Sequence, residues 1–193
     1  MNIKKALSYI CWGLLITVLN INLNFSETSS LNILPSFIGW ILIYLAQDML
    51  GQYREKIENL KLIPIILAVL TGIQWVLHLM VMGTREFYPL SLAVNLLSAY
   101  YEFTLCGMME DIAFDCDSPR GKTINTLKYV NLYCYLGMAF LGLLALFAPV
   151  EPIAMLMFIV GIIALVSIIA TIITFFGLRN DYIRWEINRE INE

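Results

Sequence analysis

The sequence predicts an all-α integral membrane protein with six transmembrane helices, arranged as three hairpins with both termini in the cytoplasm. Composition is the first observation: hydrophobic residues form 60% of the 193 positions and charged residues 14%, against about 45–50% and about 25% in soluble domains. The second is that six stretches approach the ~20 apolar residues that cross a bilayer core ~30 Å thick. The third is that basic residues gather between alternate stretches, which sets the orientation.

The first three spans are predicted at 6–25, 33–50 and 62–82. The first is an apolar run that closes on the outer side with Asn20, Asn22 and Asn24. The second opens at Pro35, because proline suits the first turn of a helix, where its missing N–H costs nothing. Its apolar run of 37–46 is short, so it also needs residues 33 and 34 or a locally thinner bilayer. The third is a longer apolar run that contains Gln74 and His78.

The last three spans are predicted at 89–109, 128–148 and 152–177. Pro89 and Pro152 mark the outer starts of the fourth and sixth spans, as Pro35 does for the second. Runs such as 162–170 are continuously apolar, whereas the strands of a membrane barrel alternate apolar and polar residues. The chain between the spans is short, so the sequence leaves no room there for a soluble domain.

The basic residues fix which side of the membrane each connection faces. Eleven of the 12 lysines and arginines lie on one side of the predicted spans: before the first, after the second, fourth and sixth, and in the first turn of the fifth. Only Arg85 lies on the opposite side. Positively charged connections stay in the cytoplasm. We therefore expect a multi-pass protein of the cell membrane, with the lipid bilayer as its first partner.

The C-terminal segment differs from the spans in its pattern. We divide the chain into a six-helix transmembrane domain, 1–178, and a cytoplasmic amphipathic tail helix, 179–193. Ile183, Ile187 and Ile191 recur every four residues on one face of this tail, with Trp185 beside them and charges of both signs at other positions. The tail could dock on a membrane or cytoplasmic protein partner, lie on the inner membrane surface, or pack on the protein's own loops.

Several classes of function are excluded by composition or spacing. A net charge of −3 offers no basic face for nucleic acid. The loop after the fourth span lacks the glycine of a phosphate loop, since Cys116 stands there, and Pro119 stands where a calcium loop needs an oxygen ligand. The four cysteines form no C-x-x-C pair, and there is one histidine. We expect no metal, no cofactor and no enzyme activity, because no nucleophile–base arrangement is recognisable.

Glu102 is the strongest candidate site residue. An ionisable side chain inside a span costs about 2.5–3.5 kcal/mol or more, so it normally faces a cavity or a partner. Asn95 is seven residues before Glu102 and Ser98 is four, so the three share one face of the fourth span. This polar stripe could carry a proton or a cation, or it could only hold a neighbouring helix through hydrogen bonds.

Three further polar residues complete the predicted substrate-binding site. Gln74 and His78 are four residues apart on the third span, at depths that overlap those of Asn95 and Ser98. A helix hairpin could therefore join them in one outward-facing pocket, or they could serve only as hydrogen bonds between helices. Asp48 lies at a depth similar to that of Glu102, and either pairs with it or reaches water at the inner interface.

The segment Asn32-Ile-Leu-Pro35-Ser-Phe37-Ile38-Gly39 opens the second span. It resembles an I-L-P-x-F-I-G signature of small multispan membrane proteins from low-GC Gram-positive bacteria, over about 30 residues. The resemblance implies a membrane protein and carries no catalytic residue. In physical terms, Pro35 starts the helix and Gly39 permits close contact between helices.

The residues favour two functions. The first is a small-solute or ion transport or binding component, with a polar intramembrane site around Glu102. The alternative is a non-catalytic accessory or sensor protein that acts through a cytoplasmic partner. Both place the protein in the membrane, but only the first requires Glu102 to exchange a proton or a cation.

Overall fold

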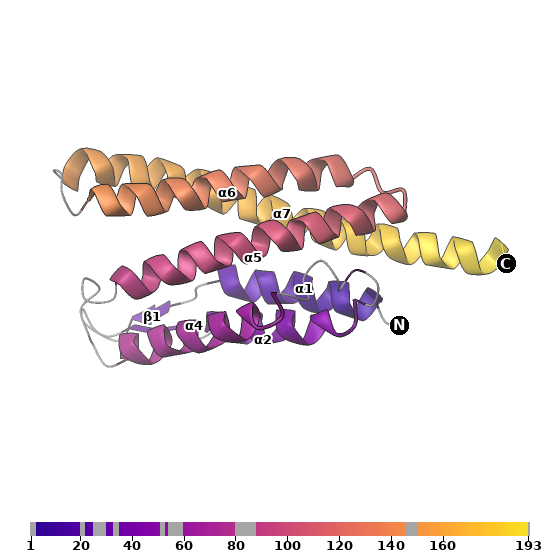
Figure 1. Ribbon diagram of the computed structural model, residues 1–193, viewed down its shortest axis with the longest axis horizontal. Coiled ribbons are helices and arrows are strands. Elements are labelled where there is room, and N and C mark those ends of the chain that lie inside the picture. Colours follow the sequence, from indigo (N-terminus) through magenta and orange to yellow (C-terminus); the bar gives the residue numbers. More distant parts are fainter. Residues whose placement is uncertain are drawn as a thin grey trace. The chain divides into compact units, whose positions relative to one another are not determined.

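A computed structural model describes residues 3–19, 22–24, 30–32, 35–50, 53, 60–79, 88–145 and 150–192. These ranges contain six helices and one pair of short strands (Figure 1). In chain order they are α1 (Ile3–Val18), β1 (Asn22–Asn24), β2 (Ser30–Asn32), α2 (Ser36–Gln47), α4 (Ile63–Leu79), α5 (Tyr88–Asp115), α6 (Gly121–Leu144) and α7 (Val150–Asn192).

The helical class is confirmed in the described ranges, since each predicted span overlaps one of the six helices. Two of these helices, α6 and α7, are long and apolar enough to cross a membrane. The helices α2 and α4 are also apolar but shorter, at 12 and 17 residues. Only 17% of the most apolar window in each of α6 and α7 is buried.

The outer end of the first predicted span differs from the prediction. The helix α1 ends at Val18 rather than near residue 25, and β1 pairs with β2 in antiparallel register, with Asn22 opposite Asn32 and Asn24 opposite Ser30. The physical reason is visible in the sequence Asn22-Leu23-Asn24, which alternates with the two-residue period of a strand. Asparagine is also a weak helix former. This segment was wrongly predicted as the last turns of a helix.

The chain divides into two compact units, and the first is Met1–Val94. Its helices α1 and α2 approach so closely that their backbones touch at Gly13 and Gly39. A Cβ atom added to Gly39 would overlap the carbonyl oxygen of Gly13, and one added to Gly13 would lie 2.8 Å from the carbonyl oxygen of Gly39. Small residues permit such contact between membrane helices. Buried side chains from both helices, such as Leu7 and Ile43, surround this crossing.

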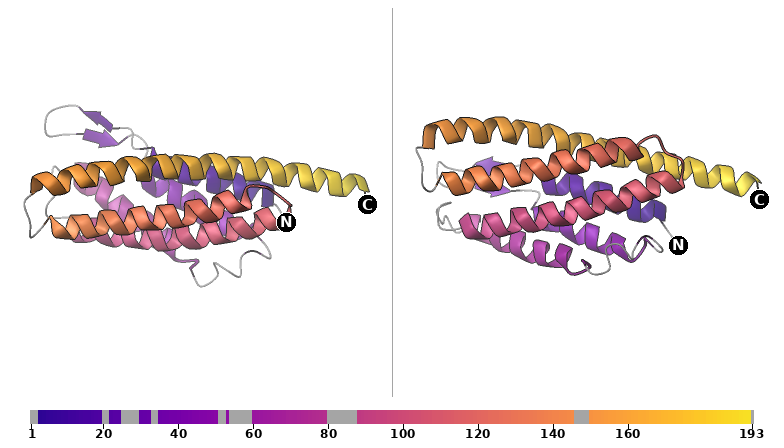
Figure 2. Two further views of the ribbon diagram at one scale, coloured as in Figure 1. Left: turned by 90° about the horizontal axis from the view of Figure 1, so that it is seen from above. Right: turned by 45° about the horizontal axis from the view of Figure 1, so that its top comes forward.

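The second unit is Asn95–Glu193, which contains most of α5 and all of α6 and α7. A tight turn joins α5 to α6, and within it Asp117 has the positive φ of 51° that aspartate tolerates better than most residues. Figure 2 shows α6 and α7 side by side over the length of α6, with α7 continuing beyond the α5–α6 turn. The predicted boundary between 178 and 179 falls inside α7, which runs unbroken to Asn192.

The continuation of α7 is attached to the α5–α6 turn. Asp181 accepts hydrogen bonds from Ser118 Oγ at 2.6 Å and from Arg120 Nε at 3.0 Å. The Arg120 guanidinium lies directly against Gly177, where a Cβ atom would collide with it. The first turns after residue 178 therefore pack on the protein's own loop, which was one of the arrangements expected for the tail.

Candidate functional site

The centre of the candidate site is a contact between α5 and α6. Tyr135 Oη donates to the Glu102 carboxyl group, at 3.0 Å from Oε1 and 3.1 Å from Oε2. Within the described ranges no basic side chain pairs with Glu102, because Lys128, the lysine nearest in sequence to Tyr135, bonds Glu110 at 2.9 Å. Lys128 Nζ also lies 5.3 Å from the ring centre of Phe103. The charge of Lys128 is therefore stabilised by groups other than Glu102. Among the described residues, Glu102 thus has a hydrogen-bond donor and no counterion.

A second polar contact joins α6 to α7. Asn131 is buried, and its Nδ2 donates to Thr171 Oγ1 at 3.0 Å while its Oδ1 accepts from Ser167 Oγ at 2.5 Å. Thr171 Oγ1 in turn donates to the Ser167 backbone carbonyl at 2.9 Å. Each hydroxyl of this group therefore has a partner, and the group fixes the rotation of α6 against α7.

A cavity of about 160 Å³ connects the two contacts. Side chains and backbone from α5, α6 and α7 line it: Asn95, Asn131, Cys134, Tyr135, Met138, Gly161, Ala164 and Ile168. Tyr135 belongs both to the cavity wall and to the contact with Glu102, and Asn131 belongs both to the wall and to the contact with α7. The arrangement can therefore hold a small ligand beside an acid that has no counterion.

The predicted stripe on α5 takes part in this site in two places. Asn95 lines the cavity, and Glu102 bonds Tyr135 of its wall. Ser98 is buried one turn before Glu102. Sequence reasoning missed Tyr135 and the group around Asn131. An asparagine inside the apolar stretch 128–148 was an available signal for the latter.

The remaining predicted site residues lie in the first unit. Gln74 Nε2 donates to Ser91 Oγ at 3.2 Å, so it does join α4 to α5 by a polar contact. Asp48 accepts a hydrogen bond from Lys61 Nζ at 2.9 Å and is 56% exposed. The side chain of His78 lies outside the described residues. A pairing of Asp48 with Glu102 stays a prediction, because the two lie in different units.

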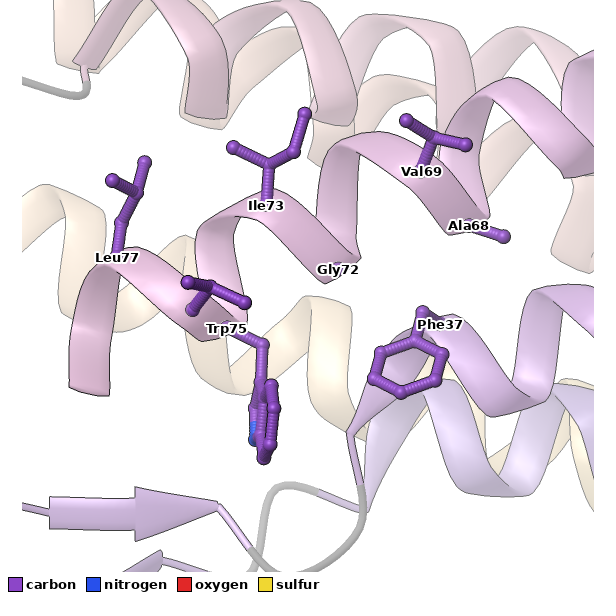
Figure 3. A pocket seen from close by; sticks show the side chains of 8 residues that line it. Phe37, Ala68, Val69, Gly72, Ile73, Trp75 and Leu77 are labelled. Atoms are coloured by element: carbon purple, nitrogen blue, oxygen red, sulfur yellow. The ribbon is translucent and has the colours of Figure 1, made fainter. Parts of the chain in front are cut away.

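The first unit also has a groove on α4, but its chemistry differs from that of the cavity. Figure 3 shows Phe37 and Trp75 facing it, with Val69 and Ile73 along the same helix. The two rings meet edge to face with centres 6.0 Å apart. Every residue of the lining is apolar or aromatic. Such a surface suits hydrocarbon, and the indole N–H of Trp75 is the one polar side-chain group in the lining.

No group of three or more His, Cys, Asp and Glu side chains is placed to hold a metal ion in the described part of the chain. None of the four cysteines in this part forms a disulfide, and all four are buried. Comparison with protein-family models, curated proteins and solved structures finds no match. The resemblance carried by Pro35 and Gly39 therefore stays an expectation, and the function must be argued from the geometry of the site.

Proposed function

We propose that the protein is a six-span integral membrane protein that binds, and moves across the bilayer, a small solute or ion at the site around Glu102. Membrane insertion is supported by the exposed apolar surface of α7, where Met155, Phe158, Val166 and Ile173 are each more than 60% exposed. A soluble protein rarely leaves so large a continuous apolar face in water. Hydrocarbon would cover this face, and the distribution of basic residues supports cytoplasmic termini.

The observation that carries the proposed binding role is the carboxyl group without a counterion. An ionised acid inside a span costs about 2.5–3.5 kcal/mol or more, whereas one hydrogen bond between membrane helices returns about 0.6 kcal/mol on average. The bond from Tyr135 therefore does not offset the cost of a charge at Glu102. A proton or a cation that joins the carboxylate would offset it, and either could be the species that the site exchanges.

A second function is favoured by the exposed end of α7. Ile187 and Ile191 are 46% and 75% exposed, beyond the part of the helix that Asp181 attaches to the turn. Trp185 lies next to them on the helix. These side chains would suit an accessory protein that docks on a cytoplasmic partner, with Glu102 serving only as a contact between helices.

The two functions are separated by Glu102→Gln. Glutamine keeps the shape and accepts the Tyr135 hydrogen bond, but it cannot ionise. Thermal unfolding of the purified protein in detergent should depend on pH and on added cations in the wild type, because the charged carboxylate is costly and its neutralised form is not. Stability should fall as the pH rises, and the fall should be much smaller in the variant.

Glu102→Asp and Tyr135→Phe are the matched controls. The aspartate variant keeps an ionisable group and should keep part of the response, while the phenylalanine variant removes the donor and keeps the acid. Identical pH and cation profiles for the wild type and Glu102→Gln would remove Glu102 from the exchanging groups. The accessory function would then be the better account of the protein.

A further inference from the structure

The wall of the cavity in the second unit is divided by chemistry. Its polar side is formed by α5 and α6, through Asn95, Asn131 and Tyr135. Its apolar side is formed mainly by α7, through Gly161, Ala164 and Ile168, with Met138 of α6. A Cβ atom added to Gly161 would meet nothing within 4 Å, so the space in front of this glycine is open. A ligand there would meet hydrogen-bonding groups on one side and hydrocarbon on the other.

The size of the cavity limits the ligand. An apolar cavity of about 150 Å³ holds a benzene molecule, and this cavity has a volume of about 160 Å³. A ligand that fills it therefore has a body of about six to eight non-hydrogen atoms.

The charges around the cavity select the sign of the ligand. Among the described residues, Cys106 on α5 and Tyr135 on α6 interact electrostatically with Glu102. Glu110 and Lys128 interact with Cys106, and Cys134 interacts with Tyr135. The part of α7 between 152 and 177 carries no charged or titratable side chain. Lys128 is already paired with Glu110, so the uncompensated charge beside the cavity is negative. A cation is favoured and an anion is excluded.

The hydrogen bonds already made determine which groups remain for the ligand. Tyr135 uses its proton on Glu102, which leaves its oxygen as an acceptor. Asn131 uses one N–H and one lone pair on α7. Asn95 lines the wall, and its amide carries an oxygen that can accept a hydrogen bond. Acceptors beside an unpaired carboxyl group match a ligand that brings several N–H donors and a positive charge.

We propose that this cavity binds a small primary amine in its protonated form, with a short apolar or aromatic body. The ammonium group would lie at the polar wall, where Asn95 and Tyr135 offer acceptors and Glu102 supplies the countercharge behind Tyr135. The body would pack on Met138, Ala164 and Ile168. This proposal rests on the proposed function, because it names the class of solute that the site around Glu102 takes.

The probes are benzylamine, benzyl alcohol and benzoate, which share a body of similar size and differ in charge. A ligand that binds the native state raises the unfolding temperature. For the full-length protein in detergent, benzylamine should give the largest rise, benzyl alcohol a smaller one and benzoate none. In Glu102→Gln the amine should lose its advantage over the alcohol.

Gly161→Leu tests the place of binding, since its side chain would fill the cavity without meeting another atom first. Gly107→Leu is the matched control: its Cβ also meets nothing within 4 Å, but it lies on α5 away from the cavity lining. The rise with benzylamine should disappear in Gly161→Leu and persist in Gly107→Leu.

Three outcomes would overturn the amine site: no rise with benzylamine, an equal rise with benzyl alcohol, or a rise that survives in Gly161→Leu. Any of these together with a pH or cation response that Glu102→Gln abolishes would leave the proposed function standing. If the pH and cation response were also absent, both the amine site and the proposed function would be overturned.

Discussion

The two units join their helices in opposite ways. In Met1–Val94 the crossing of α1 and α2 is made by backbone against backbone, and each glycine fills its place so completely that a methyl group would collide with the other helix. In Asn95–Glu193 the helices α6 and α7 are joined by the side chains of Asn131, Ser167 and Thr171. Tight contact leaves no space between helices, whereas contact through side chains can leave space beside them.

The glycines of the second unit show this difference directly. A Cβ atom at Gly137 would lie 3.7 Å from Val160, an ordinary contact, and one at Gly161 would meet nothing. These glycines are not needed for close approach of the backbones. Gly13 and Gly39 therefore serve close packing in the first unit, whereas Gly161 leaves space in the wall of the cavity in the second. A ligand site is expected only where space and polar groups coincide.

The largest predicted effect comes from filling the tight crossing. In Gly39→Ala the added methyl group would overlap the Gly13 carbonyl, and a backbone atom cannot move aside without separating the helices. We expect a loss of about 3 kcal/mol in the free energy of unfolding, at the upper end of the usual cost of overpacking. The fluorescence of Trp40, which is buried on α2, would report it.

Gly72→Ala is the control in the same unit. Its Cβ would lie 3.8 Å from Phe37, an ordinary contact, and alanine is a better helix former than glycine. This variant should be neutral or more stable than the wild type. If Gly39→Ala were as stable as Gly72→Ala, the close crossing of α1 and α2 would be wrong.

A smaller effect is expected from removing the polar contact in the second unit. Asn131→Leu deletes two hydrogen bonds to α7, each worth about 0.6 kcal/mol on average, so a loss of about 1 kcal/mol is expected. Asn125→Leu, on the same helix and outside the hydrogen-bonded group of Asn131, Ser167 and Thr171, should change stability by less. A loss in Asn131→Leu larger than that in Gly39→Ala would reverse the comparison between the units.

The helices themselves could be predicted because their signals are local. Apolar stretches and prolines locate them, and Pro35 indeed precedes α2 with the extended backbone of a residue outside the helix. The strand pair was missed because three-residue strands are too short to stand out beside a long apolar run. Its alternation at 22–24 was legible, but the stronger apolar pattern before it dominated the prediction.

Half of the candidate site could be predicted for a similar reason. Glu102 is conspicuous because a charge in an apolar stretch is costly wherever the helix faces. Tyr135 is one of 10 tyrosines, and only the rotation of α6 about its axis makes it the donor to Glu102. The cavity depends on the spacing of three helices and on the absence of a side chain at Gly161, which no local pattern records.

The smallest predicted effect is a change in how stability depends on pH, and it concerns the α5–α6 turn of the second unit. Burial raises the pKa of the Cys116 thiol above its ordinary value of 9.0, and the nearby Asp181 carboxylate adds to this. The folded state therefore favours the neutral thiol. This contribution to stability is fully present below the unfolded pKa and is lost as the pH rises through the folded pKa.

Cys116→Ala tests this contribution through the slope of stability against pH. The variant should be somewhat less stable near neutral pH, because a buried sulfur is removed, but its unfolding temperature should fall less steeply as the pH rises above 9.0, the value at which the thiol of an unfolded chain titrates. The comparison uses the difference between the two curves, so other titrating groups cancel. Parallel curves would show that Cys116 ionises as easily in the folded protein as in the unfolded chain. Ionisation of this thiol would then not weaken the attachment of α7 to the α5–α6 turn at high pH.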